Sequence, residues 1–243
     1  MKIVAINGSP RKGNTLAAIR AFAEGAKEKH EIGIINAGEL NIGPCTGCDC
    51  CMCMNGCVAK DDTNRVIDRI AEADMIVFGS PVYWWGVTAQ LKTVIDKMYC
   101  RGALIKGKKI GIILCGGASA EDEEYDLIRR QFECMAEYLK WEIVFVRKYC
   151  ANEREDLASD MGAISELVKL GKELPCEKDA GDRQEDTTVK EMNRGTWLEM
   201  LTLLDKMKAI AKKEAEEEDY QKICGHLSEI RAILDEYSPR GLS

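Results

Sequence analysis

Five short runs of apolar, largely β-branched residues alternate with longer stretches of helical periodicity over the first 173 residues. The runs IVFG and IGIILC are apolar at nearly every position, which is typical of strands buried on both faces of a parallel sheet. We predict strands at 2–6, 31–36, 74–79, 109–115 and 142–149, and helices at 14–29, 62–73, 88–99, 121–139 and 156–173. This order predicts an α/β fold with a doubly wound, five-stranded parallel sheet.

The composition changes after residue 174, the expected end of the α/β domain (1–174). Residues 175–188 are polar and acidic, as is typical of a linker. Residues 189–243 hold two apolar stripes with the three- and four-residue spacing of amphipathic helices, so we expect a C-terminal helical hairpin extension. The stripes are Trp197, Met200, Leu201, Leu204, Met207 and Ala211, then Tyr220, Ile223, Leu227, Ile230, Leu234 and Tyr237. This hairpin either packs on the α/β domain or contacts another subunit or partner.

The charge balance and the rare histidines exclude several classes of function. Lys and Arg number 34 against 41 Asp and Glu, a net charge of −7 that repels nucleic acids and anionic lipid surfaces. The sequence has only two histidines, which argues against a His-based catalytic triad or metal site as its functional centre. We find no apolar run long enough for an export signal or a membrane span, so we expect a cytoplasmic protein. In a reducing compartment its twelve cysteines more often bind metals or do redox work than form structural disulfides.

A polar, glycine-containing loop joins the first predicted strand to the first predicted helix. Its sequence is NGSPRKGNT, residues 7–15. The backbone N–H groups and the dipole of the following helix would face an anion, with Ser9, Arg11, Asn14 and Thr15 adding polar or charged groups. The loop matches neither a Walker loop nor GxGxxG, so it favours a single phosphate over ATP or a dinucleotide. The alternative is a structural turn before a well-capped helix.

Two further loops are expected at the same edge of the sheet, where open α/β sheets bind ligands. The third predicted strand ends in Pro81, Val82, Tyr83, Trp84 and Trp85. Their aromatic rings would flank a flat ligand, or pack on a neighbouring helix or subunit. The fourth strand ends in a small-residue loop that begins at Cys115 and contains Gly116 and Gly117. We therefore expect three loops to converge on one crevice.

Six cysteines lie within thirteen residues, in a loop at 44–58. Cys45, Cys48, Cys51 and Cys57 have the spacing C-x2-C-x2-C-x5-C, a compact arrangement that suits a cubane cluster. Thiolates favour iron–sulfur, zinc or copper(I). Cys50 and Cys53 are additional to this pattern, so other ligand sets stay open, as does a metal-free redox role.

These motifs together resemble those of the NADPH-dependent FMN reductase family of flavodoxin-like proteins. The resemblance rests on residues 8–15, 81–84 and 90–97 and covers roughly residues 1–173. It implies that Ser9, Arg11, Asn14 and Thr15 bind the FMN phosphate, that Pro81, Val82, Tyr83 and Trp84 line the flavin ring, and that Gly116 and Gly117 close its other side. The cysteine loop resembles that of the iron–sulfur flavoprotein branch, which implies a [4Fe–4S] cluster on Cys45, Cys48, Cys51 and Cys57.

The resulting hypothesis is an electron-transfer flavoprotein with no catalytic protein residue, because the chemistry belongs to the cofactors. Electrons would pass from reduced ferredoxin or NAD(P)H to an acceptor such as a quinone or an oxygen species. One alternative is an NAD(P)H-dependent FMN or quinone reductase without a cluster. Another is a thiol or metal redox sensor whose C-terminal helices bind a partner. The resemblance also implies a homo-oligomer, a dimer or a tetramer.

Overall fold

The computed structural model describes residues 1–52, 56–175 and 194–236. It divides into two compact units, Met1–Gly181 and Asp182–Ser243. The predicted linker at 175–188 lies almost wholly outside the described residues.

The first unit contains one sheet of five parallel strands in the order β2-β1-β3-β4-β5. The strands are β1 (Lys2–Asn7), β2 (Glu31–Asn36), β3 (Met75–Pro81), β4 (Lys109–Gly116) and β5 (Glu142–Cys150). The three central strands are buried almost throughout, which explains their continuous apolar sequences. The predicted doubly wound sheet is confirmed, and β3 and β4 extend by two and one residues into the predicted ligand loops.

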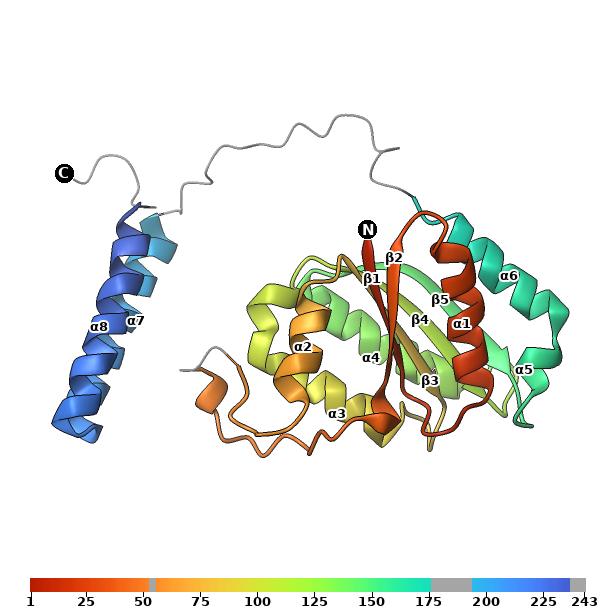
Figure 1. The fold of residues 1–243 in the computed structure, drawn as a ribbon, viewed down its shortest axis with the longest axis horizontal. Helices are drawn as coiled ribbons and strands as arrows, with labels where there is room; N and C mark the ends of the chain where they lie inside the picture. Colours follow the sequence, from red (N-terminus) through yellow and green to blue (C-terminus); the bar gives the residue numbers. More distant parts are fainter. Residues whose placement is uncertain (53–55, 176–193, 237–243) are drawn as a thin grey trace. The chain divides into compact units, whose positions relative to one another are not determined.

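Helices cover both faces of the sheet (Figure 1). On one face α2 (Thr63–Ala71), α3 (Ala89–Lys97) and α4 (Glu123–Leu139) form a core with the sheet. On the other face α1 (Asn14–Ala26), α5 (Asp156–Ser159) and α6 (Met161–Lys172) form a second core. Short 3-10 turns occur at η1 (Ala37–Glu39), η2 (Cys50–Met52) and η3 (Met98–Ile105).

The single helix predicted at 156–173 is instead two helices, separated at Asp160. The Asp160 carboxylate accepts hydrogen bonds from the backbone N–H groups of Gly162 and Ala163, at 2.9 and 3.0 Å. An aspartate that caps a helix in this way takes a non-helical backbone conformation and starts a new helix. The apolar spacing continues through this break, and for this reason periodicity alone does not reveal it.

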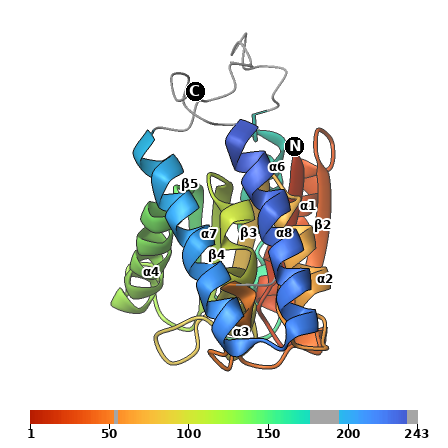
Figure 2. The same cartoon turned by 90° about the vertical axis from the view of Figure 1, so that its left-hand side faces the viewer.

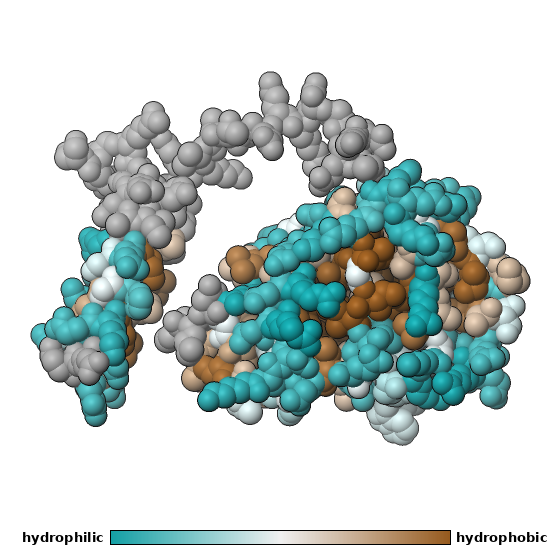
Figure 3. Space-filling model, viewed as in Figure 1, coloured by the Kyte–Doolittle hydropathy of each residue, from teal (hydrophilic) through white to brown (hydrophobic). Residues whose placement is uncertain are grey.

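The edge strand β2 lies between the two helical layers (Figure 1). In the same view apolar surface appears in this region, with polar side chains around it (Figure 3). Ile32 and Ile34 of β2 are only partly buried, as expected for an edge strand. The sheet therefore has its buried centre at β1, β3 and β4, and the ligand loops follow these three strands.

The second unit contains α7 (Arg194–Glu214) and α8 (Glu217–Glu236), which pack side by side (Figure 2). Leu204 and Leu227 are buried between them and Ile223 packs against both. The predicted helical hairpin extension is confirmed. Leu203 and Ile210 remain more than half exposed. None of the helices in the described parts of the chain has the length and apolar character needed to cross a membrane.

Candidate functional site

The loop between β1 and α1 is held in place by short hydrogen bonds. The Ser9 hydroxyl donates to the Arg11 carbonyl at 2.9 Å and accepts from the Arg11 N–H at 3.2 Å. The Asn7 carboxamide oxygen accepts from the Ser9 N–H at 3.2 Å. The Gly8 N–H donates to the Gly79 carbonyl of β3 at 2.7 Å. These contacts fix the loop beside the start of α1, where the helix dipole and unpaired N–H groups attract an anion.

Gly8 sits where no side chain fits. A Cβ at this position would lie 2.8 Å from Leu91 Cβ and 2.9 Å from the Gly79 carbonyl oxygen. The Thr88 hydroxyl donates to the Gly8 carbonyl at 2.7 Å and accepts from the Leu91 N–H at 3.2 Å, which caps α3. The loop between β1 and α1, called the phosphate loop after its expected ligand, is thus joined to the start of α3 through the Gly8 backbone.

The loop between β3 and α3 contains a tight turn at Tyr83-Trp84-Trp85-Gly86. Tyr83 and Gly86 exchange backbone hydrogen bonds of 2.9 and 3.1 Å. Trp84 and Trp85 between them have φ values of 50° and 58°, in the left-handed region that bulky residues rarely adopt. Trp84 is 91% exposed and its ring stacks edge-on against Trp85 at 5.4 Å. The turn therefore holds two indole groups in solvent at the cost of backbone strain.

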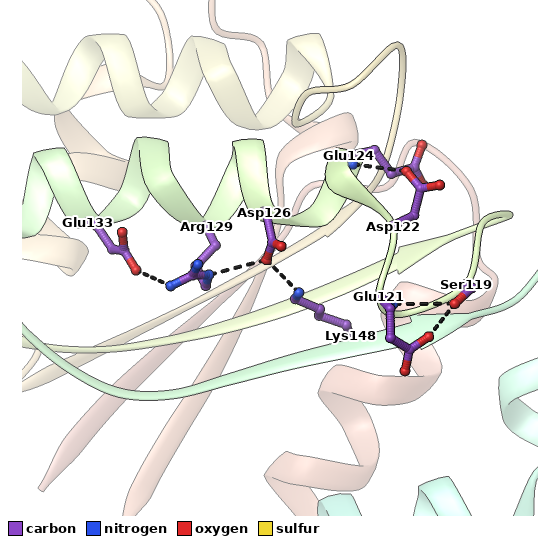
Figure 4. A network of polar contacts seen from close by, with 8 residues as sticks. All are labelled: Ser119, Glu121, Asp122, Glu124, Asp126, Arg129, Glu133 and Lys148. Atoms are coloured by element: carbon purple, nitrogen blue, oxygen red, sulfur yellow. Dashed lines mark hydrogen bonds and ion pairs between the residues drawn. The ribbon is translucent and has the colours of Figure 1, made fainter.

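The loop between β4 and α4 supplies two more glycines. A Cβ on Gly116 would lie 2.7 Å from the Glu124 carboxylate, and one on Gly117 would lie 2.5 Å from Asn152 Oδ1. The loop is secured by local polar contacts before α4 begins (Figure 4): Ser119 binds Glu121, and the Asp122 carboxylate accepts from the Glu124 N–H at 3.0 Å. Gly116 and Gly117 are therefore crowded by neighbouring side chains, and the ends of Glu124 and Asn152 would have to move to make room for a Cβ.

A cavity of about 140 Å³ opens where these loops meet. Nine of the ten predicted flavin-site residues line it: Ser9, Arg11, Asn14, Thr15, Pro81, Val82, Tyr83, Gly116 and Gly117. Trp84 is not among the lining residues, and its side chain is exposed on the protein surface instead. The expected convergence of three loops on one crevice is observed.

The loop after β5 also reaches this cavity, which no sequence motif indicated. Asn152 and Arg154 line the cavity, and the Arg154 Nε donates to the Lys12 carbonyl at 3.0 Å. The Asn14 carboxamide donates to the Glu153 carbonyl at 2.7 Å and accepts from the Leu157 N–H at 3.1 Å. Asn14 therefore ties this loop to the phosphate loop. The end of the fifth predicted strand was the available signal, because it lies at the same edge of the sheet.

Cys115 lines the cavity and is buried. Burial raises the pKa of its thiol to about 12, and a hydrogen bond with Thr15 offsets only part of this shift. The thiol is consequently protonated at neutral pH and behaves as a small apolar group.

The cysteine loop is anchored at both ends. The carboxylates of Asp61 and Asp62 accept from the backbone N–H groups of Gly43 and Asn41, at 3.1 and 2.9 Å. At the far end the Asn64 carboxamide accepts from the Cys57 N–H at 2.9 Å and donates to the Cys57 carbonyl at 2.8 Å. Cys57 is thereby fixed at the start of α2.

The four predicted ligands, Cys45, Cys48, Cys51 and Cys57, line a second cavity, of about 440 Å³. Cys100 of η3 lines it too, a residue that the spacing pattern could not identify because it lies 43 positions beyond Cys57. Within residues 1–52, 56–175 and 194–236, no three Cys, His, Asp or Glu side chains converge closely enough to hold a metal ion. Cys53 lies outside the described residues.

Cys48 and Cys50 lie close enough to shift each other's pKa. The backbone N–H and the thiol of Cys50 lower the pKa of the Cys48 thiol, and the same contact raises the pKa of Cys50. Burial raises the pKa of Cys100, with a further contribution from Cys57. The loop thus holds thiols of unequal acidity, with Cys48 the more readily deprotonated member of its pair.

The sheet order 2-1-3-4-5, with a cavity lined by the loop after β1 and three further loops at the same edge, defines a flavodoxin-like α/β domain. Solved structures agree on the fold. An NAD(P)H:quinone oxidoreductase from Methanothermobacter marburgensis matches with a TM-score of 0.55 and 17% identity, over 72% of this chain and 99% of that one. An azoreductase from Bacillus anthracis matches with a TM-score of 0.54 and 16% identity, over 71% and 99%.

The chain belongs to the NADPH-dependent FMN reductase family, whose family model matches residues 1–132. It is therefore a member of an oxidoreductase family that uses FMN, as the resemblance implied.

Curated relatives are named iron–sulfur flavoproteins. One from Archaeoglobus fulgidus is 44% identical over 98 residues, which cover 40% of this chain and 48% of the relative. One from Methanocaldococcus jannaschii is 40% identical over 99 residues, 40% of this chain and 51% of the relative. One from Methanosarcina thermophila is 35% identical over 127 residues, 49% and 64%. The chain spans about half the length of the curated relatives it matches first.

Proposed function

We propose that this protein is an FMN-dependent electron-transfer oxidoreductase that carries a [4Fe–4S] cluster on its cysteine loop. The observation that supports it best is the presence of two separate cavities in one α/β unit, one at the phosphate loop and one lined by the four spaced cysteines. When bound, FMN supplies hydride and single-electron chemistry and the cluster supplies single-electron transfer.

In this proposal the first cavity holds the phosphate end of FMN. Ser9, Arg11 and Thr15 would bind the phosphate with the loop N–H groups, while Asn14 supports them through the loop after β5. The volume of about 140 Å³ is below the ~300–1,000 Å³ typical of a ligand pocket. The flavin ring would therefore extend out of the cavity.

The ring would lie against Pro81, Val82 and Tyr83, with Gly116 and Gly117 on its other side. Trp84 would cover it from the exposed turn. The buried, protonated Cys115 would add an apolar floor and no charge.

The second cavity suits a soft metal, because five thiols line it and thiolates are the ligands of iron–sulfur clusters. Cys45, Cys48, Cys51 and Cys57 would be the ligands. The names of the curated relatives support iron–sulfur over zinc. Electrons would enter from NAD(P)H or reduced ferredoxin and leave to a quinone or oxygen species, in a homodimer or homotetramer.

The test is an assay of iron, acid-labile sulfide and FMN on protein purified without oxygen. The proposal expects about four iron, about four sulfide and about one FMN per chain. Iron and sulfide near zero in protein that retains FMN would contradict the cluster, and absence of FMN would contradict the whole proposal.

A second candidate is an FMN or quinone reductase without a cluster. It is favoured by the finding that, among the described residues, the loop thiols do not converge on one metal position. Steady oxidation of NAD(P)H by protein in which every cysteine of residues 44–58 is replaced by serine would support it. Loss of that activity in the substituted protein would oppose it.

A further inference from the structure

Lys97, the last residue of α3, is a buried cation that neither the FMN site nor the expected ligand set uses. Its side chain is only 6% exposed. Its ammonium donates a hydrogen bond to the Cys57 sulfur at 3.5 Å, and no carboxylate in the described part of the chain lies within ion-pair distance of it. Lysine is almost never this buried without a compensating anion, because the charge loses its hydration. The site around Lys97 therefore favours negative charge, part of which the Asp61 carboxylate supplies through a longer-range charge interaction.

The carboxylates on the same cavity are hydrogen-bonded or ion-paired elsewhere, although the charge of Asp61 also interacts with Lys97. Asp61 accepts from the backbone N–H groups of Gly43 and Thr63, at 3.1 and 2.9 Å. Asp96 forms an ion pair with Lys92 on the same helix. The sulfur of Cys57 is thus the hydrogen-bonded partner of Lys97, and Asp61 adds a longer-range charge interaction.

The geometry at Cys57 is fixed on both sides. Asn64 binds both backbone polar groups of Cys57, and Lys97 approaches its sulfur from the end of α3. Both Cys57 and Lys97 line the cysteine cavity. A metal bound in this cavity would thus have a cation in contact with one of its sulfur ligands.

We propose that Lys97 is the counter-charge of the thiolate site and that its N–H···S contact raises the reduction potential of the bound cluster. This inference rests on the proposed cluster. The potential of an iron–sulfur centre depends on its net charge and on hydrogen bonds to its sulfurs. A nearby cation favours the more negative, reduced form, and it acts more strongly where solvent is excluded.

A purely structural role would leave a different signature. A lysine in the last turn of a helix also interacts favourably with the helix dipole. That interaction would change the stability of the domain but not the potential of the cluster. The reduction potential is therefore the deciding measurement.

The experiment compares Lys97→Met and Lys97→Gln, which remove the charge, with Lys97→Arg, which keeps it. Lys108→Met is the matched control, because Lys108 is also partly buried but donates to the Ala71 and Ala73 carbonyls instead of a sulfur. The potential is measured in the FMN-loaded protein by redox titration of the reduced cluster's EPR signal. Retained FMN shows that each variant has folded.

We expect a more negative potential, or loss of iron with FMN retained, in the two neutral variants. Lys97→Arg and Lys108→Met should keep the wild-type iron content and stay near the wild-type potential. Wild-type iron content and potential in Lys97→Gln or Lys97→Met would overturn the inference while leaving the proposed cluster in place. Wild-type protein with FMN but no iron would instead contradict the proposed function itself.

Discussion

The proposed FMN site (the FMN cavity) and the proposed cluster site (the cysteine cavity) are built in opposite ways. The FMN cavity lies at the ends of buried strands, and backbone hydrogen bonds such as Gly8 to Gly79 fix its loops without any ligand. Among its described residues, the cysteine loop is held near its ends by Asp61 and Asn64, and Cys45 and Cys48 are exposed. The backbone N–H groups of a phosphate site can be positioned by the fold alone. The ligands of a thiolate site are commonly brought together only when the metal binds.

Helix α3 links the two regions. Thr88 caps its start and binds the phosphate loop, and Lys97 at its end faces Cys57. Nine residues at about 1.5 Å each give a helix of roughly 13 Å. A substitution that acts on one cavity can therefore be tested for its effect on the other.

The largest expected effect is at the cysteine loop. Cys57→Ser removes the sulfur of a proposed cluster ligand whose backbone is held by Asn64. We therefore expect loss of most of the bound iron and sulfide. FMN content should be unchanged, because Cys57 does not line the FMN cavity. Iron, sulfide and FMN assays check this.

Cys134→Ser is the control, since Cys134 is exposed on α4 and lies outside both cavities. It should keep wild-type iron. Full iron content in Cys57→Ser would show that Cys57 is not a ligand, and loss of FMN as well as iron would show that the two cavities are not independent.

The fold could be predicted from the sequence because its signals are local. Continuous apolar runs located all five strands, whereas the break at Asp160 and the 3-10 turns were missed. That break depends on a carboxylate that caps a helix within an uninterrupted apolar pattern.

The candidate sites were predicted less completely. Motifs located nine lining residues, but Arg154 and Cys100 reach their cavities through tertiary packing and have no neighbouring motif. Lys97 is part of the recognised pattern, yet only its burial and its contact with a sulfur indicate a role.

A smaller effect is expected from Gly8→Ala in the preformed cavity. The new methyl group would lie 2.8 Å from Leu91 Cβ and 2.9 Å from the Gly79 carbonyl, so we expect a loss of about 1–3 kcal/mol in unfolding free energy. FMN affinity should fall with it, while iron content stays the same. Gly102→Ala, which has no atom within 4 Å of the new Cβ, should change stability by less than about 0.5 kcal/mol. Equal urea midpoints for the two variants would contradict this account.

The buried thiol of Cys115 should make the stability of the protein fall at alkaline pH. The raised pKa of Cys115, about 12, means that the folded state keeps a proton that the unfolded chain loses at its ordinary thiol pKa. Its contribution to stability is therefore complete below about pH 8.5 and is lost as pH rises toward 12, by up to about 1.4 kcal/mol per pH unit. Urea unfolding from pH 7 to 10 should show a shallower decline in Cys115→Ala than in Cys134→Ala. Parallel curves would mean that the thiol is not protected by burial.

The smallest effect is expected at the strained turn. Trp84 has φ 50°, which asparagine adopts more readily than a bulky residue, so Trp84→Asn should raise the unfolding free energy by about 0.5–1 kcal/mol. Tyr138→Gln, an exposed aromatic residue on the regular helix α4, should leave stability nearly unchanged. Urea unfolding of both variants without FMN checks this, and a Trp84→Asn variant no more stable than the wild type would show that the turn is unstrained. If Trp84→Asn is more stable but binds FMN more weakly, then the strained backbone at Trp84 contributes to FMN binding and lowers the stability of the protein.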